Sequence, residues 1–128
     1  MFYTRIASVV SGRLTREAKR SYAPDGKLIA EFFLACGDGS VKYPSMFVKV
    51  CVWEELAEKA LPLLDRKGLN VEASGFLLVR LYEGAHGKSV LIELLGVREL
   101  KFFDVYGELK QVLNDSKVEL KEVRNGLR

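Results

Sequence analysis

Hydrophobic and polar residues alternate along several short runs of the chain, and Gly, Pro and Asp separate these runs. Strand side chains point alternately to opposite faces, so strict alternation predicts β-strands with one buried face. Residues 6–14, 27–36 and 47–53 show this pattern. A basic loop at residues 15–22, predicted to be mobile, follows the first strand and leads into the turn sequence Ala-Pro-Asp-Gly at 23–26. The first half of the chain is therefore predicted to be antiparallel β-structure.

The spacing of apolar residues becomes helical after the third strand. Leucine and alanine form one stripe over residues 54–67, acidic residues open the segment and a glycine follows it. Pro62 is expected to shorten or kink this helix, because it lacks an N–H group. Alternation then returns over residues 69–82, with a glycine near the middle that favours a sharp bend. A hairpin tip at 83–87 leads into a last strand at 88–100.

The predicted order of three strands, one helix and two strands is that of the oligonucleotide-binding (OB) fold. The size agrees, because 128 residues with 48% hydrophobic content suit one compact domain. We therefore expect an all-β domain at residues 1–103, a five-stranded OB barrel with one helix between strands 3 and 4. Residues 104–128 are rich in charge and sparse in apolar residues. They are expected to form a C-terminal helix or a partly ordered extension.

The two faces of the third strand differ in character. Valine occupies the positions predicted to face the core (Val48, Val50 and Val52). The other face carries Phe47, Lys49 and Trp53, which are two rings and a cation. Aromatic rings stack on bases, each worth about 1–3 kcal/mol with little sequence preference, while Lys and Arg neutralise phosphates. This face is therefore predicted to bind a single strand of nucleic acid.

Other rings and cations extend this candidate surface along the fourth strand and into the loops. The predicted nucleic-acid-binding residues are Phe47, Trp53, Tyr82, Lys49, Arg80, Arg20, Arg16, Tyr22, Lys42, Tyr43 and Lys88. For the rings and for the cations, an alternative without DNA binding remains open. An outward ring such as Trp53, Phe33 or Phe76 is often packed against a helix, a loop or a second subunit, and a charged loop is often only solvated surface.

Charge and candidate chemistry narrow the functional classes. The formal net charge is +3, and residues 1–53 hold eight Lys or Arg against four Asp or Glu. His86 is the only histidine and has no adjacent carboxylate to orient it, and Cys36 and Cys51 lack the spacing of metal ligands. We predict a non-enzymatic protein with no metal and no cofactor. The chain has no signal-peptide pattern and no membrane-spanning run, so we expect a cytoplasmic protein without a membrane partner.

Several stretches together resemble the bacterial-type single-stranded DNA-binding protein family over approximately residues 3–103. The matching stretches are Gly12-Arg13-Leu14, Arg-Ser-Tyr-Ala-Pro-Asp-Gly at 20–26, Ala-Glu-Phe-Phe-Leu-Ala at 30–35, and residues 47–58 and 67–75. The resemblance implies that base-stacking aromatics fall on Phe47, Trp53 and Tyr82. It also implies that phosphate-contacting cations fall on Arg20, Lys49 and Arg80.

The same resemblance implies non-sequence-specific binding of single-stranded DNA in replication, recombination and repair. It also implies assembly into a homo-oligomer, with a tetramer favoured and a dimer as the other option. Members of the family usually end in an acidic, hydrophobic tip that recruits replication or repair enzymes, whereas this chain ends Val-Arg-Asn-Gly-Leu-Arg. Recruitment through such a tip is therefore not expected. The alternative is a protein-interaction or replication-restart accessory subunit on the same fold.

Overall fold

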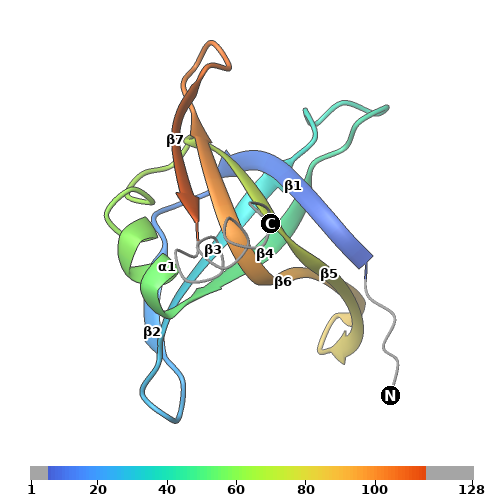
Figure 1. The fold of residues 1–128 in the computed structure, drawn as a ribbon. Coiled ribbons are helices and arrows are strands. Elements are labelled where there is room, and N and C mark those ends of the chain that lie inside the picture. The colour runs from blue at the N-terminus through green and yellow to red at the C-terminus, as the bar shows by residue number, and fades with distance from the viewer. Residues whose placement is uncertain (1–5, 115–128) are drawn as a thin grey trace, which may run out of the picture.

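The computed structural model describes residues 6–114, except the side chain of Tyr82. Figure 1 shows strongly curved strands and one short helix. In chain order, the described elements are β1 (Ile6–Leu14), β2 (Lys19–Tyr22), β3 (Leu28–Cys36), β4 (Met46–Trp53), α1 (Glu54–Ala60), β5 (Asn70–Gly84), β6 (Gly87–Phe103) and β7 (Leu109–Asn114).

Five of these strands close into a barrel. β1 pairs with β5, β5 with β6, β6 with β4 and β4 with β3, and β3 returns to β1 through Arg13 and Leu14. The pairs in this ring are antiparallel except β4–β6, which is parallel. The helix α1 lies between the third and fourth strands of the ring in chain order. The predicted five-stranded OB barrel with one helix is therefore confirmed.

The barrel interior is formed by the inward positions that alternation predicts. On β3 and β4 these side chains are at most 2% exposed (Ala30, Phe32, Leu34, Val48, Val50 and Val52). Leu56, Ala57 and Ala60 of α1 join the same core cluster. Because the burial of apolar surface is the dominant favourable term in folding, these inward residues hold the barrel together. The outward residues of β3 and β4 can therefore differ in character without weakening the core.

Residues 19–22 form a strand, so the expectation of a mobile loop through 15–22 is wrong for this part. The turn at 23–26 is closed by two hydrogen bonds, from Ala23 N to Lys27 O and from Gly26 N to Ala23 O. This turn folds the chain back, so that β2 pairs antiparallel with the first residues of β3. The turn thus brings residues 19–22 beside β3, although their charged sequence does not itself indicate a strand.

The helix is shorter than the predicted 54–67. It ends at Ala60, and turns follow in which Leu63 N and Leu64 N both donate to Ala60 O. Pro62 has no N–H to continue the helical hydrogen-bond pattern, which agrees with its predicted effect.

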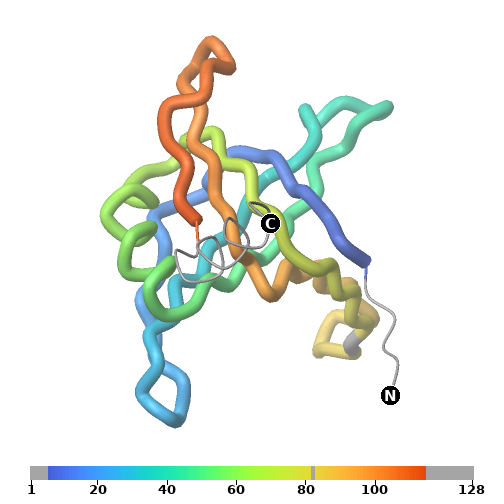
Figure 2. Tube along the Cα trace, in the orientation of Figure 1, coloured from blue at the N-terminus to red at the C-terminus, as the bar shows by residue number. Residues whose placement is uncertain are grey.

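Gly75 lies at an irregularity in the β5–β6 pairing, where Ser74 pairs with Glu99 and Phe76 pairs with Leu95, so that the bulge of extra residues is on β6. A Cβ atom at Gly75 would lie only 2.5 Å from Leu95 O, so only glycine allows this approach of β5 to β6. Beyond the bulge the β5–β6 hairpin extends past the barrel (Figure 2). There Val79 and Leu81 are exposed, although they keep the parity of the core positions.

Residues 109–114 form β7, which pairs with β6, so a helix is not present in this part of the 104–128 segment. The turn before β7 is built by Asp104, whose Oδ1 accepts hydrogen bonds from Tyr106 N and Glu108 N, both 2.9 Å long. These bonds, with nearby Lys110, hold the pKa of Asp104 below its ordinary value. Leu113 joins the core. The predicted extension beyond residue 114 lies outside the described residues.

Candidate nucleic-acid interface

The strand registers bring the outward residues of four strands into rows. Phe33, Lys49 and Glu93 lie side by side on β3, β4 and β6. Glu93 in turn lies opposite Leu78 of β5, and one row away Arg80 lies opposite Leu91. We call this surface the outer face. Its residues are Lys19, Glu31, Phe33, Phe47, Lys49, Cys51, Trp53, Leu78, Arg80, Leu91 and Glu93.

The aromatic rings of β4 lie outside the hydrophobic core. Phe47 is 57% exposed and Trp53 is 42% exposed, while the valines between them face inward and are buried. Six residues of a strand span about 20 Å, so these rings mark the two ends of a path along β4. Lys49 is half-buried between them. The outer face therefore offers rings and a cation in one line, with Phe33 of β3 exposed beside it.

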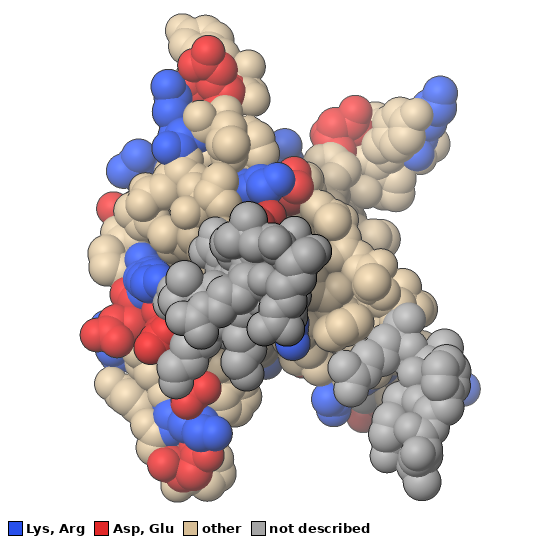
Figure 3. Space-filling view, in the orientation of Figure 1, with Lys and Arg blue, Asp and Glu red and all other residues tan. Residues whose placement is uncertain are grey.

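The cations of the outer face alternate with carboxylates. Arg80 Nε lies 3.2 Å from Glu93 Oε1. Lys49 lies beside Glu93 in the parallel register, and Lys19 of β2 lies opposite Glu31 of β3. In the view of Figure 3, Lys and Arg are likewise scattered among Asp and Glu and form no large basic patch. Binding of a polyanion to such a surface depends on where individual cations point rather than on a broad positive field.

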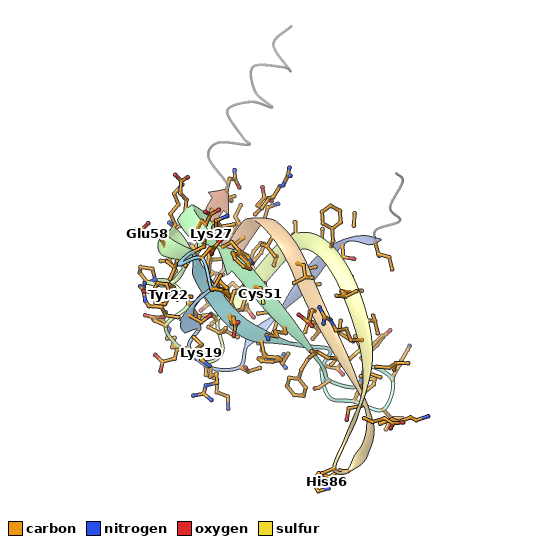
Figure 4. All side chains as sticks on the ribbon, turned by 90° about the horizontal axis from the view of Figure 1, so that it is seen from below. Lys19, Tyr22, Lys27, Cys51, Glu58 and His86 are labelled. Carbon is orange, nitrogen blue, oxygen red and sulfur yellow. The ribbon has the colours of Figure 1, made fainter. Side chains whose placement is uncertain are left out.

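The structure separates two of the predicted basic-loop residues from the outer face. Arg20 and Tyr22 lie opposite Ala30 and Leu28, so they share the side of β3 that carries the core residues. Lys19 has the other parity and lies on the outer face. Figure 4 shows Lys19 and Tyr22 on β2. Lys19 would have been singled out for this face if residues 19–22 had been predicted as a strand.

The other predicted residues lie in loops or at the hairpin tip. Arg16 is exposed in the connection between β1 and β2. Lys42 and Tyr43 share the loop before β4, where Lys42 Nζ lies 5.4 Å from the centroid of the Tyr43 ring, a cation–π contact. Lys88 pairs with Glu83 near the hairpin tip. Tyr82 pairs with Ser89 in the strand ladder, and its side chain lies outside the described residues.

Cys51 lies under the centre of the outer face and is nearly fully buried. Burial is the main cause that raises the pKa of the Cys51 thiol, and Glu31 and Glu93 raise it while Lys49 lowers it. The thiol is therefore protonated at neutral pH and is a poor nucleophile. Cys36 is half-buried and its pKa is likewise raised by burial. Both cysteines are free thiols in the structure.

A hollow of about 420 Å³ adjoins Trp53 at one end of the outer face. It is lined by Trp53, Glu54, Glu55, Leu56, Gly96, Val97 and Arg98. Arg98 lines the same hollow as Trp53 and adds a cation at this end of the outer face. Its place depends on the irregular pairing of β5 with β6, which local patterns do not predict. Glu54 has φ 55°, in the left-handed region that residues other than glycine seldom adopt. Such strained positions are often found at functional sites.

Residues 6–114 include His, Cys, Asp and Glu, which are the residue types that could hold a metal ion. Within this range, no three or more His, Cys, Asp or Glu side chains are grouped so that they could hold a metal ion. His86 lies at the far tip of the β5–β6 hairpin, well away from Cys51 (Figure 4). Of the helical structure described for this chain, none is long and apolar enough to cross a membrane.

Comparisons with known proteins point to one family. A model of the Single-strand binding protein family matches residues 7–103. Single-stranded DNA-binding protein 3 of Listeria innocua is 30% identical over 100 residues, which are 75% of this chain and 62% of that protein. Single-stranded DNA-binding protein of Halalkalibacterium halodurans is 27% identical over 107 residues, covering 80% and 63% of the two chains. Single-stranded DNA-binding protein A of Bacillus subtilis is 28% identical over 100 residues, covering 75% and 58%. The matched segments thus span less than two thirds of the length of these relatives.

Proposed function

The chain belongs to the single-strand binding protein family, and from this premise we propose that it binds single-stranded DNA without sequence preference on the outer face. One observation carries this proposal. Phe47 and Trp53 are exposed along β4, with the half-buried Lys49 between them, on the strand whose other face carries the buried valines. Several exposed rings grouped on one face mark an interaction site, and stacking on aromatic rings is a contact that every base can make.

The binding mechanism follows from the order of groups along the outer face. Bases stack on Phe47 and Trp53, and on Phe33 beside them, while Lys19, Lys49 and Arg80 neutralise phosphates. The ring of Tyr43 and the cations Arg16, Lys42 and Lys88 extend the path from the loops. A site of this length suits a few nucleotides per chain, within the roughly 4–16 that OB folds cover. The mechanism includes no bond-breaking step, so we propose a binding protein without catalysis.

The biological role that fits such binding is protection and presentation of unpaired DNA in replication, recombination and repair. A protein with this role works beside the chromosome, which is cytoplasmic in the bacteria that carry the relatives. We also propose a homo-oligomer, with a tetramer favoured. The exposed side chain of Val9 on β1 supports it, because exposed apolar surface is often covered by a second subunit.

Fluorescence of Trp53, the single tryptophan of the chain, tests the proposal. Titration with a poly-pyrimidine single strand is expected to quench this fluorescence, because the indole stacks on a base. The affinity is expected to fall steeply with salt, with each neutralised phosphate contributing about −0.7 to the slope of log affinity against log salt. A duplex of the same length is the control and is expected to bind more weakly. If the single strand neither quenches nor binds at low salt, a protein-binding accessory subunit becomes the better account.

A further inference from the structure

One carboxylate is buried on the surface that we propose for DNA. Within residues 6–114, charged side chains are exposed or half-buried with the exception of Glu93, which is 8% exposed. Glu93 lies on the outer face, between Lys49 of β4 and the β5 strand that carries Arg80. A negative charge at this place repels the phosphates of a bound strand. Its presence on the outer face therefore needs a reason.

The partner of Glu93 suggests what this carboxylate does. A buried carboxylate is stable only when it is paired, and removing its partner leaves an uncompensated buried charge. Arg80 provides the pairing through Nε, at 3.2 Å from Glu93 Oε1. Breaking the ion pair between Arg80 and Glu93 when DNA binds would therefore be unfavourable in free energy. A contact between phosphate and Arg80 has to form while the Glu93 pair persists.

The geometry of the guanidinium group allows both contacts together. Its five N–H donors are fixed in one plane, and the ion pair with Glu93 is made by Nε. The Arg80 side chain remains 59% exposed. When Nε of a guanidinium group binds a carboxylate, N–H donors on the edge formed by the two terminal amino groups remain available, and a phosphate oxygen can accept from them.

We propose that Glu93 is a positioning residue that holds the guanidinium group of Arg80 on the outer face, with its terminal amino groups presented to a DNA phosphate. This proposal rests on the proposed function, because it assigns a role within the same DNA-binding face. Glu93 itself does not contact DNA. It reduces the number of conformations that the long Arg80 side chain loses on binding, and its negative charge is the cost of that preorganisation.

The substitution Glu93→Gln separates positioning from simple charge. If charge alone mattered, removal of a carboxylate from the outer face would tighten DNA binding. Positioning predicts the reverse, a loss of about three- to fivefold in affinity for an oligo-dT strand at physiological salt. It also predicts that the slope of log affinity against log salt becomes shallower by about 0.7 per chain, because one phosphate contact is lost. A general weakening of the barrel would not selectively lower the salt dependence of binding by the amount that one phosphate contact contributes.

Glu31→Gln is the matched control, because it removes the same charge from the same face and Glu31 is part of no ion pair among the described residues. This variant is expected to bind at least as tightly as the wild type, with no shallower slope. A second variant, Arg80→Lys, keeps the charge but replaces the planar fork by a single ammonium group. It is expected to lose about as much affinity as Glu93→Gln, and the double variant is expected to be no weaker than Glu93→Gln alone.

Thermal unfolding of each variant shows whether it is folded, and Arg80→Lys keeps the proposal testable if Glu93→Gln does not fold. The proposal is overturned if Glu93→Gln binds as tightly as Glu31→Gln with an unchanged slope, if Arg80→Lys binds like the wild type, or if the two losses are additive. These results leave the proposed function standing as long as the wild type binds. Failure of the wild type to bind at low salt removes the proposed function and this proposal together.

Discussion

Replacement of Phe47 by alanine is expected to weaken binding of an oligo-dT strand by about 1–3 kcal/mol, which is roughly five- to 150-fold in affinity. The ring of Phe47 is mostly exposed on β4 and faces away from the barrel interior. Its removal therefore takes away a stacking surface without opening a cavity in the core. The free energy of unfolding, measured in urea, should change by about 0.5 kcal/mol or less.

Tyr106→Ala is the control for this prediction. Tyr106 is an aromatic residue that is more exposed than Phe47, but it lies in the turn between β6 and β7 and is not one of the outer-face residues. Its replacement is expected to leave the affinity for oligo-dT unchanged. Two results would contradict a base-stacking role for Phe47. One is an equal loss of affinity for oligo-dT in both variants, and the other is a lower free energy of unfolding in Phe47→Ala with an unchanged affinity.

The largest expected effect on stability comes from Phe32, the neighbour of Phe33, a ring that we propose to contact DNA. Phe32 is 2% exposed in the core, whereas Phe33 on the opposite side of β3 is 38% exposed. Phe32→Ala is expected to lower the free energy of unfolding by about 3–5 kcal/mol, because it removes buried apolar surface and leaves a cavity. Phe33→Ala is expected to cost about 1 kcal/mol or less and instead to weaken DNA binding.

Urea unfolding of both variants at one protein concentration measures this difference, since oligomerisation makes apparent stability depend on concentration. The two positions carry the same residue type in the same strand, so intrinsic strand propensity cancels in the comparison. Equal losses of stability would show that the two faces of β3 are not core and surface. The parity of the barrel strands would then be wrong.

The alternation of residue types was sufficient to predict the inward and outward faces of β3 and β4. The reason is physical, because a strand with one buried face selects apolar residues at every second position. The same rule fails along the distal part of β5. Val79 and Leu81 continue the inward parity, yet they lie where the hairpin has passed the end of the barrel. Alternation reports which side a residue faces and not what covers that side.

The elements that were missed depend on partners distant in sequence or on turn geometry. β2 is a short charged segment that becomes a strand because the following turn folds it onto β3. The apolar residues of β7 (Leu109, Val112 and Leu113) do not alternate with polar ones, and its strand conformation comes from pairing with the end of β6. The Arg80–Glu93 pair likewise depends on the register of the β5–β6 hairpin, which local patterns do not determine. The candidate surface was therefore predicted in outline, and its charge pairing was not.

Photo-crosslinking of an iododeoxyuridine-substituted oligo-dT strand, followed by mass spectrometry of the peptides, tests most directly which surface holds the DNA. The outer face predicts adducts on Phe47 and Trp53, because these rings stack on the bases. Exposure alone would instead favour Tyr106 beyond the end of β6. Adducts on the peptide that contains Tyr106, with none on the β4 peptide, would show that the strand binds elsewhere and would contradict the proposed interface.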